Sequence, residues 1–226
     1  MLPGRPKQCP TAVLLDMDGT LIDTEPLWER AQVRLAREFG VPFGAEDRAA
    51  TIGTPASSWL PGWLASAGLG SGDEVVAEAA ARIEAEVLAA VSENLLLKKG
   101  AATLLEELVD RKAPCALVSA SPRRLVDAVL AQLDPAPFVG SISGDDVARP
   151  KPDPEPYLAA ARLVGARPEH TVAIEDSLTG ARSASRAGCR VLWVPTDSAS
   201  AAEEHWKVLG SLSEIDLDAL LGGGGS

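Results

Sequence analysis

The feature that most constrains the fold is a series of short apolar runs, separated by stretches with a helical pattern. Four runs are clear, each bounded by polar or turn residues: Ala12 to Leu15, Cys115 to Val118, Val172 to Ile174, and Val191 to Val194. Their apolarity is continuous rather than alternating, as in strands that are covered on both faces. Helical patterns are found at 104–111, 123–133, 155–164 and 179–187, and a weaker strand is expected near Gly140 to Ser143. This rhythm predicts an α/β fold with a Rossmann-like parallel sheet.

One connection, between the first strand and the helix near Leu104, is far too long for an ordinary loop. It contains helical patterns at 26–39, with Asp23 or Thr24 as a candidate N-cap, and at 73–91. Gly53-Thr-Pro55 is expected to form a turn. We therefore predict an inserted α-helical cap domain at 25–97 and a core formed by 1–24 and 98–221. The tail at 222–226, Gly-Gly-Gly-Gly-Ser, is typical of a flexible linker.

Charge and cysteine content exclude several classes of partner. The formal net charge of -11 argues against nucleic acid or an anionic membrane as the main partner, because both favour a basic face. Cys9, Cys115 and Cys189 are odd in number and widely spaced, so neither a disulfide framework nor a zinc site is indicated. No targeting segment is identified, and a cytoplasmic location is expected. The oligomeric state is left open.

Two aspartates follow the first apolar run directly. Asp16 and Asp18 flank Met17, so in extended backbone their carboxylates point to the same side. Gly19 and Thr20 then turn the chain and place backbone N–H groups beside these carboxylates. The pair lies at the carboxyl edge of the predicted sheet, where open α/β sheets bind their ligands. A shared ion and a shared substrate are therefore expected there.

The segment from Asp16 to Pro26 resembles the first motif of haloacid dehalogenase superfamily phosphatases. The resemblance is strongest to the subgroup that includes sugar phosphatases and β-phosphoglucomutase, and it covers residues 10 to 195. Three later segments match in the right order: Leu117-Val-Ser119, Arg149-Pro-Lys-Pro-Asp153 and Ile174-Glu-Asp-Ser177. Four ordered motifs, three of them at strand ends, are a strong signal.

The resemblance implies a role for each matching residue. Asp16 would attack phosphorus to give an aspartyl-phosphate, and Asp18 would protonate the leaving oxygen and then activate water. Mg²⁺ would be bound by Asp16, the Asp18 backbone carbonyl and Asp176, with Glu175 acting on the metal indirectly. The phosphoryl group would be bound by the remaining matching residues: Gly19, Thr20, Ser119, Ala120 and Lys151.

Some of these residues also have purely structural interpretations. Lys151, in a Pro-flanked loop, could be a solvated charge, and Ser119 with Ser121 could cap the helix that follows Pro122. Glu175-Asp176-Ser177 could likewise cap the next helix. Asp145 and Asp146, which precede the Lys151 loop, are interpreted as a solvated turn rather than as metal ligands.

The cap sequence separates the candidate reactions. The absence of lysine from 25–97 argues against phosphonoacetaldehyde hydrolases, which need a cap lysine, and Asp18 argues against halide displacement. In β-phosphoglucomutase a histidine and a cap arginine occupy the positions that Trp28 and Ala56 align with here, although Arg48 or Arg82 could substitute for the arginine. Hydrolysis of a small phosphorylated metabolite, of the sugar or polyol phosphate class, is therefore the favoured activity. The phosphomutase and a non-catalytic phospho-ligand-binding relative are the alternatives.

Three tryptophans lie in the predicted cap. Trp28, Trp59 and Trp63 could form an apolar wall above the phosphate site, with two of the three expected in the cap core. Pro61-Gly62 is expected to break the helix that contains Trp59 and Trp63.

Overall fold

The fold is built on a parallel six-stranded sheet with the strand order β3-β2-β1-β4-β5-β6. The structure, a computed structural model, describes residues 11–51, 54, 56–70, 72–195 and 205–221. The strands are β1 (Ala12–Asp16), β2 (Cys115–Val118), β3 (Phe138–Ile142), β4 (Thr171–Glu175), β5 (Arg190–Trp193) and β6 (Lys207–Val208). The predicted tail at 222–226 and most of the predicted turn at 53–55 lie outside the described residues.

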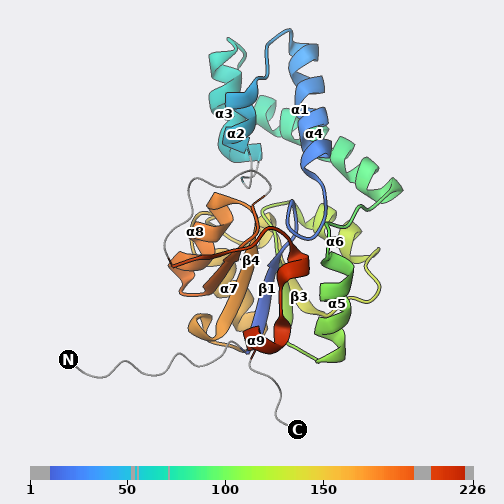
Figure 1. The fold of residues 1–226 in the computed structure, drawn as a ribbon. Helices are drawn as coiled ribbons and strands as arrows, with labels where there is room; N and C mark the ends of the chain where they lie inside the picture. Colours follow the sequence, from blue (N-terminus) through green and yellow to red (C-terminus); the bar gives the residue numbers. More distant parts are fainter. Residues whose placement is uncertain (1–10, 52–53, 55, 71, 196–204, 222–226) are drawn as a thin grey trace, which may run out of the picture.

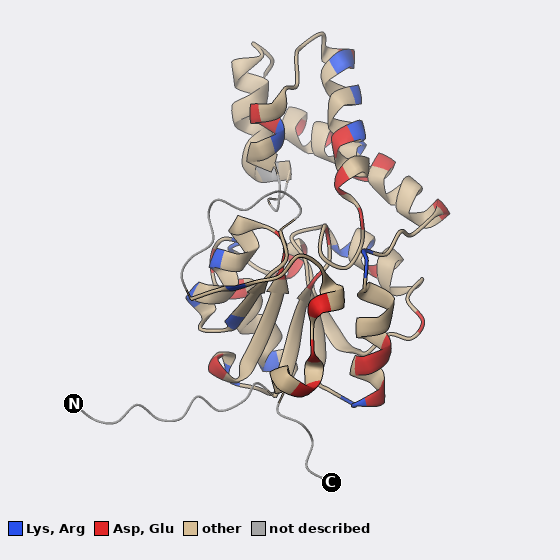
Figure 2. Cartoon of the chain, viewed as in Figure 1, with Lys and Arg blue, Asp and Glu red and all other residues tan. Residues whose placement is uncertain are grey.

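Alternate residues of the strands pack against helices on opposite faces of the sheet. Leu14 packs with the residues of α7 (Glu155–Leu163) and α8 (Leu178–Ala187), on one face. Val13 and Leu15 lie on the other face of the sheet. They pack with residues of α5 (Ala101–Asp110), α6 (Arg123–Leu130) and α9 (Leu217–Leu221). Both faces of the sheet are therefore covered by helices and shielded from water, which explains why the apolar runs in the strands are continuous. Figure 2 shows that charged residues lie mainly on helices and loops, while the strands are largely uncharged.

A separate group of four helices lies beyond the end of the sheet at which β1 finishes (Figure 1). These helices are α1 (Glu25–Phe39), α2 (Ala45–Thr51), α3 (Ala56–Ser66) and α4 (Asp73–Glu93). Two adjacent segments join them to the core: the Asp23 amide donates to Leu96 O at 2.8 Å, and the Lys98 amide donates to Leu21 O at 2.9 Å. The predicted fold, a Rossmann-like α/β core with an inserted helical cap, is confirmed.

One prediction about local structure was wrong. Pro61 does not break its helix, since α3 continues through it. Burial of Leu60, Trp63 and Leu64 on one side of α3 offsets the backbone hydrogen bond that proline cannot donate. Asp145 and Asp146 are exposed, as predicted, and they lie in a short 3-10 helix, η1 (Gly144–Asp146), in which Asp146 completes a capping box with Ser143.

The edge strand β6 was not predicted. It has only two residues, both exposed, so it carries no apolar run to detect. Among the described residues, no helix is both long and apolar enough to cross a membrane.

Candidate active site

The three central strands bring the predicted catalytic residues together. β1 lies between β2 and β4, so Asp16, Ser119 and Glu175 all reach the same edge of the sheet. Asp16 pairs in register with Val118, the last residue of β2. Residues more than a hundred positions apart in the sequence thus meet because parallel strands end at one edge.

Lys151 lies at the centre of this group. Its ammonium donates to Asp16 Oδ1 at 2.6 Å, to Glu175 Oε1 at 2.6 Å and to the Val118 carbonyl at 3.2 Å. The residue is only 4% exposed, so the interpretation of Lys151 as a solvated charge is wrong. Burial alone would lower the pKa of the lysine, but the attraction of Asp16 and Glu175 outweighs it and raises the pKa. The ammonium is therefore a fixed positive charge beside Asp16.

Three buried carboxylates form a cluster around one point. Asp16, Glu175 and Asp176 each offer an oxygen, and these oxygens all lie within 4.8 Å of one another. Asp16 Oδ2 is buried and has no hydrogen-bond partner among the described residues. Burial, and then the charge of Glu175, raises the pKa of Asp16 to about 8. Burial and the charges of Asp16 and Glu175 also raise the pKa of Asp176 well above its usual value. One lysine does not balance three carboxylates, so the cluster fits a divalent cation with oxygen ligands.

Glu175 is held differently from the two aspartates. Its Oε1 accepts from Lys151 and, at 2.5 Å, from the Tyr157 hydroxyl, and its Oε2 accepts from Ser177 at 3.1 Å. Gly180 makes room for this carboxylate, because a Cβ there would lie 1.9 Å from Glu175 Oε1. Both oxygens of Glu175 are thus committed to protein donors. This arrangement suits a residue that orients Lys151 and acts on a cation from behind its direct ligands.

The turn after Asp18 is shaped around Asp176. Gly19 has a φ of +77°, and a Cβ on it would lie 2.0 Å from Asp176 Oδ2, so only glycine fits. The Thr20 hydroxyl donates to Asp176 Oδ1 at 3.1 Å. Thr20 was expected to bind substrate. In the structure its hydroxyl instead donates to Asp176, which is a predicted metal ligand. Ser177, not Asp176, caps α8, by accepting from the Gly180 amide.

The Asp18 carboxylate accepts hydrogen bonds from four side chains. Thr24 and Trp28 donate to Oδ1, at 2.7 and 3.2 Å, and Ser119 and Ser121 donate to Oδ2, at 2.9 and 2.8 Å. Trp28 comes from the first helix of the cap, Thr24 directly precedes that helix, and the two serines come from the loop after β2. Asp18 therefore connects the core to the cap.

The serine contacts also correct the capping interpretation of Ser119 and Ser121. No side chain of the preceding residues caps α6; instead Asp145 accepts from the Arg123 amide at 2.8 Å. The sequence offered no signal that Ser121 or Trp28 would contact Asp18. The Trp28 contact depends on how the cap is placed over the core, and the Ser121 contact depends on the path of the loop after β2.

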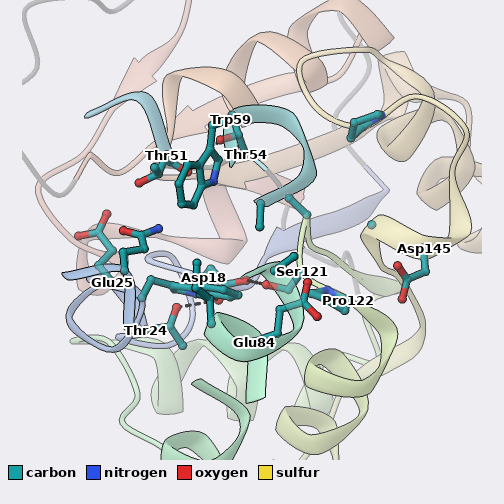
Figure 3. A pocket seen from close by; sticks show the side chains of 18 of the residues that line it. Asp18, Thr24, Glu25, Thr51, Thr54, Trp59, Glu84, Ser121, Pro122 and Asp145 are labelled. Carbon is teal, nitrogen blue, oxygen red and sulfur yellow. Dashed lines mark hydrogen bonds between the residues drawn. The ribbon is translucent and has the colours of Figure 1, made fainter. Parts of the chain in front are cut away.

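A cavity of about 360 Å³ opens between the core and the cap, next to Asp18 and Asp176. Figure 3 shows Thr51, Thr54 and Trp59 on the cap side of this cavity and Ser121 and Pro122 on the core side. Ala120 is among the lining residues, as expected for a residue near the phosphoryl group. Of the three cap tryptophans, Trp28 and Trp59 line the cavity, and Trp63 is buried in the cap core. Trp59 is half-buried and its ring also packs on Phe43 and Trp63, so the expectation that two of the three belong to the cap core holds for Trp63 and Trp59.

The two arginines considered as phosphate ligands differ in position. Arg48 lines the cavity, where it forms an ion pair with Glu29 at 3.1 Å. Arg82 pairs with Glu38 and lies over the Phe39 ring, and it is not among the cavity residues.

An acidic centre at the carboxyl edge of a Rossmann-like sheet, closed by a helical cap, defines a class of capped α/β hydrolases. Residues 10–188 match the haloacid dehalogenase-like hydrolase family, and the chain belongs to that family.

Several curated relatives with similar sequences are named as phosphatases. Validoxylamine A 7'-phosphate phosphatase from Streptomyces hygroscopicus subsp. limoneus is 33% identical, over 89% of this chain and 94% of the relative. Hexitol phosphatase A from Escherichia coli strain K12 is 34% identical, over 90% of this chain and 92% of the relative. These relatives and the family match confirm the predicted class of enzyme, a phosphoric monoester hydrolase of the sugar-phosphatase subgroup.

Solved structures agree with the fold. A mutant of CbbY from Rhodobacter sphaeroides, in complex with xylulose-(1,5)-bisphosphate, matches with a TM-score of 0.82 and 27% identity. That match covers 93% of this chain and 99% of the other. β-Phosphoglucomutase from Clostridium difficile has a TM-score of 0.79 at 19% identity, over 93% of this chain and 95% of the other, which shows a common fold.

Proposed function

We propose that this chain is a Mg²⁺-dependent phosphatase that hydrolyses a small sugar or polyol phosphate through an aspartyl-phosphate at Asp16. The observation that carries the proposal is how Asp16 is held: Lys151 donates to one oxygen at 2.6 Å, and the other oxygen has no partner in the described part of the chain. A carboxylate anchored through one oxygen and free at the other is oriented to act as a nucleophile.

In the first step Asp16 Oδ2 attacks phosphorus, and the bond between phosphorus and the leaving oxygen breaks. The leaving oxygen takes a proton from Asp18. A protonated Asp18 has one acceptor position fewer, so one of its four donors must turn away before it can act as an acid. If the donor that turns away is Ser119, its hydroxyl is free to donate to a phosphoryl oxygen, as its predicted role requires.

In the second step a water molecule gives its proton to Asp18 and attacks phosphorus, which releases inorganic phosphate and restores the Asp16 carboxylate. Asp18 thus ends the cycle in the protonation state in which it began. Lys151 stays charged throughout and offsets the negative charge that gathers between Asp16 and the phosphoryl group.

The residues that would hold Mg²⁺ are Asp16, Asp176 and the backbone carbonyl of Asp18, with Glu175 behind them. When bound, Mg²⁺ supplies positive charge that lets an anionic nucleophile approach an anionic phosphoryl group. The support is the buried carboxylate cluster, which has a single buried lysine in contact with it among the described residues.

The sugar or polyol class is supported by the relatives and by the cavity. Phosphatases named for a hexitol and for phosphorylated carbohydrates are 34% and 32% identical to this chain. The phosphomutase alternative has less support, because Trp28 and Ala56 offer no basic group and Arg48 is paired with Glu29.

The experiment is a screen of sugar and polyol phosphates with Mg²⁺, read both as released phosphate and as isomerised sugar phosphate. Released phosphate that is lost with chelator and with Asp16→Asn supports the hydrolase. Isomerisation of β-glucose 1-phosphate to glucose 6-phosphate without phosphate release would indicate the mutase, and binding without turnover would indicate the non-catalytic relative.

A further inference from the structure

The part of the cavity that lies away from Asp16 is acidic. Among its lining residues are four carboxylates besides those of Asp18 and Asp176: Glu25, Glu29, Glu84 and Asp145. Figure 3 shows Glu25, Glu84 and Asp145 distributed around the cavity rather than gathered at one point. The single basic lining residue among the described residues is Arg48.

The nearby guanidinium groups are already paired with these carboxylates. Arg48 Nη1 donates to Glu29 Oε1 at 3.1 Å. Arg124, from α6 of the core, pairs with Glu84, from α4 of the cap. Glu29 and Glu84 thus neutralise these two guanidinium groups, and the Asp145 carboxylate adds a negative charge to the lining. A second anionic group on a substrate that reached Arg48 would lie beside the Glu29 carboxylate, which repels it.

The remaining lining residues are apolar or neutral. Trp28 and Trp59 provide flat apolar surfaces that suit the C–H faces of a carbohydrate, and Ile83 adds an aliphatic contact. Gln32, Thr51 and Thr54 supply uncharged hydrogen-bonding groups. The Thr51 hydroxyl donates to the Arg48 carbonyl at 2.8 Å and the Thr54 hydroxyl to the Thr51 carbonyl at 2.9 Å, and both keep acceptor positions.

We infer that the cavity selects phosphomonoesters whose leaving group is a neutral or positively charged polyol, and rejects leaving groups that carry a second anion. This inference rests on the proposed phosphatase function. It specifies, in addition, the charge at the end of the substrate that lies away from the phosphate. Glu29 and Glu84 are the specificity-determining residues, because each holds the guanidinium that a second anion would need.

The test uses three six-carbon phosphates that differ only at C1: sorbitol 6-phosphate, 6-phosphogluconate, and 1-amino-1-deoxysorbitol 6-phosphate. At low ionic strength we expect kcat/KM for 6-phosphogluconate to be about ten-fold or more below that for sorbitol 6-phosphate. The amino compound should be used at least as well as sorbitol 6-phosphate. Added salt should reduce these differences. Equal or better use of 6-phosphogluconate would overturn the inference and leave the proposed hydrolysis intact.

A binding measurement separates this inference from the proposed function. Dissociation constants of the three compounds, measured by calorimetry with Mg²⁺ and the Asp16→Asn protein, should follow the same order. Tightest binding of 6-phosphogluconate would contradict the inference even if no turnover were found. Absence of phosphate release with the expected order of binding would instead contradict the proposed function alone.

Substitutions at the Glu29–Arg48 pair assign the selectivity to named residues. Glu29→Gln releases Arg48 and should reduce the preference for sorbitol 6-phosphate over 6-phosphogluconate by about three- to ten-fold. The double variant Glu29→Gln/Arg48→Gln removes both charges and should restore the preference. Glu38→Gln is the matched control, because Glu38 lies on the same helix, pairs with Arg34 and Arg82, and does not line the cavity. A preference that stays unchanged in Glu29→Gln would remove Glu29 from the account.

Discussion

Lys151 donates to Asp16 Oδ1 at 2.6 Å, while the buried Asp16 Oδ2 has no hydrogen-bond partner within the part of the chain that the structure describes. The two residues lie 135 positions apart and meet at the carboxyl edge of the sheet. The same ammonium contacts Glu175, so one lysine orients the nucleophile and neutralises part of the cluster around it. The proposed reaction depends on this contact.

Gly19 should be essential for the geometry of Asp176. Gly19→Ala would place a Cβ 2.0 Å from Asp176 Oδ2 and strain a backbone with a φ of +77°. We expect a loss of kcat of more than about a hundred-fold, because Asp176 must move. Steady-state kinetics and urea denaturation measure the two effects.

Gly40→Ala is the matched control, since Gly40 has a φ of +70° but nothing within 4 Å of a Cβ. It should lose about 1 kcal/mol of stability and keep its activity. Equal activity of the two variants would show that the contact with Asp176 is unimportant.

The stability of the metal-free protein should depend on pH through Asp16. Its pKa is about 8 in the folded protein and 3.8 as the reference value, so the folded state binds more protons between these pH values. The free energy of unfolding should therefore fall as pH rises from about 4 to about 8. Mg²⁺ should raise the melting temperature more at pH 8 than at pH 5, measured by calorimetry.

Asp16→Asn isolates this effect, because asparagine does not ionise. The metal-free variant should be more stable than the natural sequence at pH 8, and the difference should vanish toward pH 4. A difference that is constant across this range would show that ionisation of Asp16 does not cause the pH dependence of the stability.

Trp28 should affect catalysis through Asp18. Trp28→Phe keeps an aromatic ring but removes the N–H that donates to Asp18 Oδ1 at 3.2 Å. We expect kcat to fall about ten-fold, since a hydrogen bond to a charged group is lost. Trp59→Phe changes a cavity wall that makes no contact with Asp18, so it should alter KM rather than kcat. Equal effects of both substitutions on kcat would contradict a positioning role for Trp28.

Much of the core could be predicted because its local patterns agree with its tertiary environment. β2 occupies the predicted residues, and β1 and β4 extend the predicted strands by one residue and by two. Asp16, Ser119, Lys151, Glu175 and Asp176 come together because strand ends in a parallel sheet are fixed by topology.

The cap was harder to predict, because its side chains respond to contacts that sequence patterns do not record. The helix through Pro61 persists because its neighbours are buried, and Trp59 lines the cavity while it also packs on Phe43 and Trp63. The hydrogen bonds from Trp28 and Ser121 to Asp18 join segments whose separation in sequence gives no periodic signal.

The central claim, that phosphorus is transferred to Asp16, can be measured directly. Rapid acid quench during turnover of a sugar phosphate, followed by borohydride reduction and peptide mass spectrometry, converts an aspartyl-phosphate to homoserine. The account predicts homoserine at position 16, formed only with Mg²⁺ and absent from Asp16→Asn. Turnover with the modification at another residue, or turnover that persists in Asp16→Asn, would contradict it.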